Sequence, residues 1–125
     1  MKQIIQTDQA PAAIGPYSQA TTINGMVFTS GQIPLDPASG EVLEGDITAQ
    51  TELVMNNLMA VLKEAGCAAG NVMKTTCFLK DMADFAAFNA VYARYFSEAP
   101  PARSCIAVKA LPKDVLVEVE AVAVK

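Results

Sequence analysis

Residues 115–124 read Val-Leu-Val-Glu-Val-Glu-Ala-Val-Ala-Val. Successive side chains of a β-strand point to opposite faces of its sheet, so this stretch predicts a strand with two different faces. One face is entirely apolar, whereas the other carries Glu118 and Glu120 among apolar residues. The segment therefore indicates a sheet with one face buried in a core and one face that combines carboxylates with apolar side chains.

The segments before this strand supply the rest of a sheet. We expect further strands at 3–6, 18–23, 26–30, 72–79 and 104–108, because these runs are rich in β-branched and other apolar residues. Asn24-Gly25 lies between two of them and favours a type I′ hairpin, since both central residues of that turn need a positive φ.

Two helical patterns interrupt the strands. Apolar residues recur at helical spacing over 47–65, with Asp46 placed to cap the first turn and Gly66 placed to end the helix. Asp81 can cap a second helix, which carries an aromatic stripe typical of a core and stops before Pro100-Pro101.

The order of elements is thus β-β-β-α-β-α-β-β, an α+β fold with a six-stranded sheet and both helices on one face. A chain of 125 residues suits one domain over residues 1–125. The other face of the sheet would lack a cover. Together with the 52% apolar composition, this favours an oligomer that buries the face between subunits.

Composition excludes several function classes. The net charge is −4 and no basic cluster is present, so nucleic acid is not an expected partner. No apolar run is long enough for a signal peptide or a membrane span, which predicts a cytoplasmic protein. Three widely spaced cysteines, Cys67, Cys77 and Cys105, argue against a disulfide framework or a thiolate zinc site. The absence of histidine removes Ser-His-Asp and Cys-His catalysis and most transition-metal sites.

Arg103 is the first candidate for a binding residue. It follows Pro100-Pro101-Ala102 and lies just before an apolar strand, and a guanidinium beside a core strand needs an anionic partner. That partner is either an internal carboxylate or a bound one. Arg94, the only other arginine, lies in the last turns of the second helix and there complements the helix dipole.

A glutamate of the mixed face of the last strand, Glu118 or Glu120, is the leading candidate for a general base in a chain without histidine. A solvated sheet face would explain it equally well, but partial burial would raise its pKa and suit it to proton transfer. Tyr17 can form the wall of a pocket, and Gly31, after Ser30, can bring a backbone N–H close to a ligand. Each of these also has a purely structural interpretation, as a core-edge aromatic or a turn at a strand end.

At these positions the chain resembles the RidA family of reactive intermediate deaminases, also described as YjgF-like or L-PSP endoribonuclease-like proteins. The resemblance covers essentially the whole chain. It is carried by residues 13–20 (AIGPYSQA), 27–34 (VFTSGQIP), 101–105 (PARSC), 111–114 (LPKD) and 117–121 (VEVEA).

The resemblance implies a chorismate-mutase-like fold and a homotrimer whose sheets form a barrel-like core with clefts between subunits. It implies cofactor-free and metal-free hydrolysis of 2-imino acids or their enamine tautomers, such as 2-iminobutanoate and 2-iminopropanoate, to 2-oxo acids and ammonia. Arg103 matches the family's carboxylate-binding arginine and Glu118 matches the glutamate associated with the catalytic water. Tyr17, Ser30-Gly31 and Cys105 match substrate-binding positions, whereas Glu120 does not match the catalytic glutamate.

The chain departs from the family pattern at two places. The stretch between Tyr95 and Arg103 is slightly short, which can alter the rim of the cleft, and Val119 replaces the commoner Ile or Met. Two other functions remain open: non-catalytic binding of 2-oxo acids as a sensor, and the RNA cleavage or translation inhibition attributed to some relatives. The charge and the missing histidines count against the latter.

Overall fold

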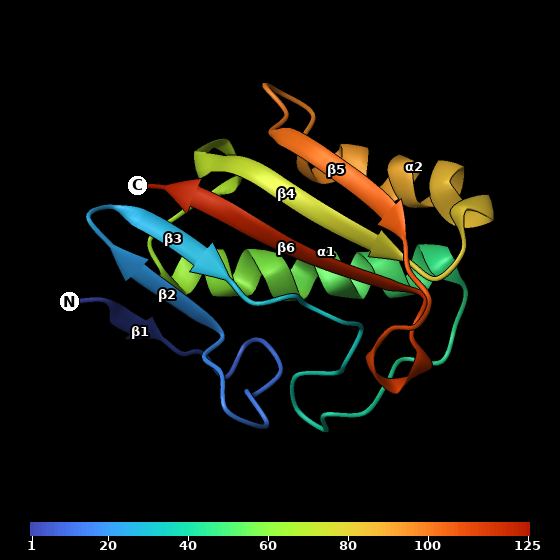
Figure 1. Cartoon of the computed structure of the whole chain (residues 1–125), viewed down its shortest axis with the longest axis horizontal. Helices are drawn as coiled ribbons and strands as arrows, with labels where there is room; N and C mark the ends of the chain where they lie inside the picture. The colour runs from blue at the N-terminus through green and yellow to red at the C-terminus, as the bar shows by residue number, and fades with distance from the viewer.

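The computed structural model describes residues 1–125, in which two α-helices lie behind a six-stranded sheet (Figure 1). The strands are β1 (Gln3–Ile5), β2 (Ala20–Ile23), β3 (Met26–Thr29), β4 (Val72–Leu79), β5 (Ala102–Ala107) and β6 (Val117–Val124); the helices are α1 (Ile47–Glu64) and α2 (Phe85–Tyr95). Their order in the sheet is β1-β2-β3-β6-β4-β5, and only the β4–β5 pair is parallel. The predicted α+β class and the predicted order of elements are confirmed.

Local signals in the sequence determine the hairpin and the first helix. Asn24 and Gly25 have φ angles of 51° and 78°, which join β2 to β3 by the expected left-handed turn. The Asp46 side chain accepts a hydrogen bond from the Ala49 N–H at 2.9 Å, and Gly66 follows α1 with φ at 83°. Both predicted ends of this helix are confirmed within one residue.

Several predicted boundaries were wrong. β5 begins at Ala102 rather than Ser104, because it pairs with β4 from Lys74 onward. β6 begins at Val117 rather than Val115, since a 3-10 turn over Pro112–Asp114 precedes it. Asp81 caps another 3-10 turn, Met82–Asp84, which leads into α2.

The core lies between the helices and one face of the sheet. β6 is central, and its Val117, Val119, Ala121 and Ala123 are buried beneath α1. The aromatic stripe of α2 joins this core through Phe88 and Tyr92, whose rings lie 5.6 Å apart. No helix in the structure combines the length and apolar character needed to cross a membrane.

The other face of the sheet has no cover within the chain, as predicted. Register places Phe28 of β3 beside Val122 of β6, and Ile106 of β5 in line with Phe78 of β4. Phe28 is 42% exposed and Ile106 is 49% exposed. We call this surface, with Glu118 and Glu120 on it, the open face. Apolar side chains gathered on an exposed sheet mark a contact surface.

Candidate functional site

A β-bulge shapes the open face beside β6. β3 pairs with β6 up to Phe28–Val122, and pairing resumes at Gln32–Val119. Three residues of the β3 side, 29–31, therefore face two of β6, 120–121. The Thr29 hydroxyl accepts the Ala121 N–H at 3.0 Å and replaces the lost ladder bond. The bulge explains why β3 ends at Thr29 instead of Ser30, and it turns Ser30-Gly31 toward Glu118.

Only glycine at position 31 leaves room for the Glu118 carboxylate where it lies. A Cβ built on Gly31 would overlap the carboxylate of Glu118 at Oε2. The constraint is close approach and not backbone strain, because the φ of Gly31 is not in the left-handed region. The expected proximity of Gly31 to the site is thus explained by its contact with Glu118.

Glu118 is a half-buried carboxylate without a cationic partner. The only ion pairs in the chain are Lys80–Asp114 and Arg94–Glu52, so neither of them involves Glu118. Burial raises the pKa of Glu118, and the like charge of Glu120, two residues along the same face, raises it further. A carboxylate with a raised pKa is a stronger base than an ordinary surface glutamate.

The loop that carries Tyr17 is fixed by a buried amide. The Gln19 side chain accepts the Thr7 N–H at 2.7 Å and donates to the carbonyl oxygens of Thr7, Ala10 and Pro11 at 3.0, 3.3 and 2.8 Å. Ser30 is tied to the same segment, since its hydroxyl donates to the Ser18 carbonyl. Sequence reasoning missed Gln19; the available signal was a glutamine at the start of a predicted strand, and the structure places it directly before β2.

These residues enclose one cavity of about 480 Å³. Its charged lining residues are Glu118 and Lys113, and most of the remainder is small or apolar. The full lining is Pro11, Ala12, Ile14, Tyr17, Gln19, Ser30, Gly31, Gln32, Ile33, Leu35, Pro112, Lys113 and Glu118. Four of the six predicted site residues, Tyr17, Ser30, Gly31 and Glu118, are therefore brought together.

Arg103 lies in a separate place, on the edge strand β5 against α2. Its Nη1 donates to Asn89 Oδ1 at 2.6 Å, and its guanidinium carbon lies 4.8 Å from the centre of the Tyr92 ring and 5.4 Å from that of Phe85. No carboxylate of the chain pairs with it. Of the two partners that the sequence left open, the internal one is therefore excluded. Arg94, by contrast, pairs with Glu52 of α1 at 2.9 Å in addition to lying in the last turn of its helix.

Cys105 accompanies Arg103. It is two residues along the same strand, pairs in register with Cys77 of β4, and is partly exposed. Burial raises the pKa of its thiol, and the nearby Arg103 charge opposes that effect. A cavity of about 360 Å³ borders Arg103 and is lined also by Asn89, Tyr92, Pro100 and Pro101, so the short connection before β5 forms its rim.

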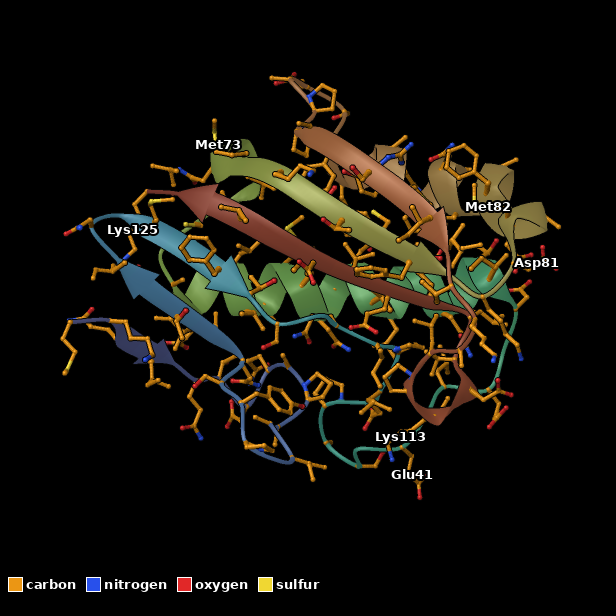
Figure 2. All side chains as sticks on the ribbon, in the orientation of Figure 1. Glu41, Met73, Asp81, Met82, Lys113 and Lys125 are labelled. Atoms are coloured by element: carbon orange, nitrogen blue, oxygen red, sulfur yellow. The ribbon has the colours of Figure 1, made fainter.

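The sheet separates the two groups. Arg103 and Cys105 pair with Thr75 and Cys77, whose side chains are buried on the helix-covered face. Glu118 pairs with Phe78 on the open face. Figure 2 shows the labelled Lys113 at the turn that precedes β6. Within one chain the predicted site residues thus form two half-sites on opposite faces of the sheet. We call them the glutamate half-site (Tyr17, Ser30, Gly31, Glu118) and the arginine half-site (Arg103, Cys105).

Asn89 is a further residue that sequence reasoning missed. It lies four residues after Phe85 and three before Tyr92, so these three side chains share one face of α2. A lone polar residue within the aromatic stripe was the available signal. No group of three histidine, cysteine, aspartate or glutamate side chains is arranged to hold a metal ion.

This fold and these motifs match one family. The model of the endoribonuclease L-PSP family matches residues 7–125. A RutC family protein of Synechocystis is 60% identical over 124 residues, covering 98% of this chain and 95% of the relative. The chain therefore belongs to the L-PSP family, also called the YjgF or Rid family.

Particular relatives carry more specific names. A protein of Salmonella typhimurium named 2-iminobutanoate/2-iminopropanoate deaminase is 49% identical, with 100% of this chain and 99% of that protein covered. The crystal structure of TdcF from Escherichia coli with bound serine superposes with a TM-score of 0.94 at 45% identity, covering 98% of each chain. A Thermotoga maritima structure described as a putative endoribonuclease gives a TM-score of 0.98 at 50% identity, covering 100% of this chain and 98% of that one.

The raised pKa of Glu118 predicts an effect on stability. Where the pKa of a carboxyl group is higher in the folded than in the unfolded chain, the free energy of unfolding decreases as the pH rises between the two pKa values. Glu118→Gln should therefore increase the free energy of unfolding at neutral pH. The gain should vanish as the pH falls below the ordinary glutamate pKa, where both states are protonated. Denaturant unfolding at fixed protein concentration across pH 4 to 8 (about the range that brackets the shift) measures it.

The matched control is Glu41→Gln, which removes an exposed carboxylate from the loop before α1. This variant should show no comparable gain at neutral pH. An equal gain in both variants would attribute the effect to net charge and contradict the assignment to Glu118.

Proposed function

We propose that this protein is a deaminase that hydrolyses 2-imino acids, such as 2-iminobutanoate and 2-iminopropanoate, to 2-oxo acids and ammonia. The observation that carries the proposal is the pair of half-sites: an arginine without an internal carboxylate partner and a glutamate of raised pKa without a cationic partner. The deaminase name of the Salmonella relative and the serine bound to TdcF support a small carboxylate ligand.

Arg103 would bind the substrate carboxylate. A guanidinium presents parallel N–H groups that match a carboxylate in two bonds, and charge-assisted bonds of this kind are strong when partly buried. Asn89 occupies one donor of Nη1 only, so donors remain for a ligand. Fixing the carboxylate fixes the neighbouring imine carbon, which makes attack on it effectively unimolecular.

Glu118 would act as the general base. A water molecule held between its carboxylate and the imine carbon would lose a proton to Glu118 as its oxygen bonds to that carbon. The carbon–nitrogen double bond becomes single and a carbinolamine forms. This carbinolamine is neutral when the imine enters in its protonated form. Glu118 then returns its proton to the nitrogen and the remaining carbon–nitrogen bond breaks. The hydroxyl proton passes back to the Glu118 carboxylate as the hydroxyl oxygen becomes the carbonyl oxygen, so that ammonia and the 2-oxo acid are released. A general base in this position contributes about 10²–10⁴-fold to the rate.

Both half-sites can act on one substrate only if different chains supply them, because the sheet lies between them. A homotrimer in which neighbouring copies cover the open face would bring the arginine half-site of one chain to the glutamate half-site of the next. The exposed Phe28, Met26 and Ile106 of the open face support this arrangement, since a second copy would bury them.

A sensor that binds 2-oxo acids without turnover would use the same residues, so only measurement of turnover separates it from the enzyme. RNA cleavage fits less well. The chain has no histidine and a net charge of −4, and the cavity beside Glu118 contains one cationic side chain, Lys113.

The proposal is tested by ammonia release from 2-iminopropanoate generated in situ by an amino-acid oxidase. The unsubstituted protein should accelerate release over the spontaneous rate. Arg103→Ala should lose most of kcat/KM, because its substrate is no longer held, and Glu118→Gln should lose about 100-fold or more in kcat while still binding 2-oxobutanoate. If the unsubstituted protein did not accelerate ammonia release, the deaminase proposal would be refuted and non-catalytic binding of 2-oxo acids would remain as the function.

The division of the site between chains gives a separate prediction. Arg103→Ala and Glu118→Gln subunits, each inactive alone, should regain about a quarter of the unsubstituted activity when unfolded together and refolded as mixed trimers. Random assembly puts an intact arginine opposite an intact glutamate at roughly one interface in four. The control mixes the same variants without unfolding. If mixed refolding restored no activity, both residues of a working site would have to come from one chain.

The contact between Gly31 and Glu118 predicts the effect of one methyl group. Gly31→Ala should reduce kcat/KM about as strongly as Glu118→Gln, because the added Cβ displaces the carboxylate. Gly70→Ala is the matched control, since no atom lies within 4 Å of the Cβ it would add. Ammonia release from 2-iminopropanoate measures both variants, and full activity of Gly31→Ala would contradict the placement of Glu118.

A further inference from the structure

Arg103 is held firmly by its surroundings, but no group there neutralises its positive charge. Asn89 Oδ1 accepts from Nη1 at 2.6 Å, which is short for a bond between nitrogen and oxygen. The acceptor is a neutral amide on α2, and neither ion pair of the chain includes Arg103. The side chain is thus tethered at one end by a group that carries no charge.

Two aromatic rings restrict the guanidinium further. The rings of Tyr92 and Phe85 lie within the distance at which a cation is attracted to an aromatic face. Tyr92 is itself fixed, because its hydroxyl is hydrogen-bonded to Thr75 Oγ1 at 2.7 Å in the core. Rotation of Arg103 is therefore opposed by the rings and by the amide together, and none of these three groups cancels the positive charge.

We propose that Asn89 is a positioning residue that orients Arg103 through a neutral acceptor and so keeps its full charge available to a ligand carboxylate. This inference rests on the proposed function, in which Arg103 binds the carboxylate of the imino acid. Neither alanine nor aspartate at this position would combine a hydrogen-bond acceptor for Arg103 with the absence of a negative charge. Alanine supplies no acceptor, and aspartate supplies one that also competes with the substrate.

The comparison with aspartate makes the inference specific. Aspartate has nearly the same shape as asparagine, so Asn89→Asp would keep the tether and add a negative charge at 2.6 Å from Nη1. The guanidinium would then form an internal ion pair on a partly buried surface, and a ligand carboxylate would have to compete with it. The fold should tolerate this change, because the new contact is attractive.

The test compares Asn89→Asp, Asn89→Ala and the unsubstituted protein. Calorimetric titration with 2-oxobutanoate should give a Kd raised by about tenfold or more in Asn89→Asp. For 2-iminopropanoate the KM should rise by a similar factor, whereas kcat should change much less, since Glu118 is untouched. Asn89→Ala should show a smaller rise in both constants. The melting temperature of Asn89→Asp should not fall below that of the unsubstituted protein.

The matched control is Asn56→Asp on α1, which adds the same charge at an exposed asparagine that accepts a hydrogen bond from Tyr95 at 2.9 Å. It should leave Kd and KM unchanged. Unchanged binding in Asn89→Asp overturns the inference, as does an equal rise in Asn89→Ala or in Asn56→Asp. Failure of the proposed function appears differently: the unsubstituted protein would then release no ammonia, while the Kd series would still test Asn89. Failure of the unsubstituted protein to bind 2-oxobutanoate overturns both.

Discussion

Strand β6 lies between β3 and β4, so its side chains alternate between the helix-covered core and the open face. This alternation decides where every other feature of the molecule can lie. Val117, Val119, Ala121 and Ala123 hold α1 against the sheet, and the same geometry forces Glu118 to the opposite side. A carboxylate on a face covered by no helix of its own chain is only half desolvated, which raises its pKa without burying it in the core.

The irregular segments around β6 form the surroundings of Glu118. The bulge at 29–31 brings Gly31 against Glu118, and the missing Cβ leaves room for the carboxylate. Gln19 fixes the loop that carries Tyr17 at the same cavity. On the other side of the sheet, α2 performs the equivalent task for Arg103 through Asn89 and two aromatic rings. Regular elements therefore supply the charged groups, and neighbouring polar or small residues set their directions.

Local patterns allowed much of this fold to be predicted from the sequence. The alternation in 115–124, the Asn24-Gly25 turn and the Asp46 cap each act over a few residues, and each was confirmed. The order of strands in the sheet was not predicted, because β6 enters between β3 and β4 through pairings distant in sequence. The start of β5 was missed for the same reason: pairing with β4 recruits Ala102 and Arg103, which no local signal marks as strand.

For the candidate site, residue types and the family resemblance pointed to six positions, but only the three-dimensional structure shows which face of the sheet each residue occupies. Register assigns Arg103 and Glu118 to opposite sides of one sheet, and no rotation of side chains could bring them together while the sheet stays paired. In the proposed deaminase, this division of the site would make activity depend on whether the chains are assembled. A lone copy could hold a ligand at Arg103 yet has no base on that side to act on it, so catalytic output would depend steeply on protein concentration near the threshold for assembly. Newly synthesised or highly diluted chains would bind without turning over, and the quaternary structure itself would then switch the chemistry on.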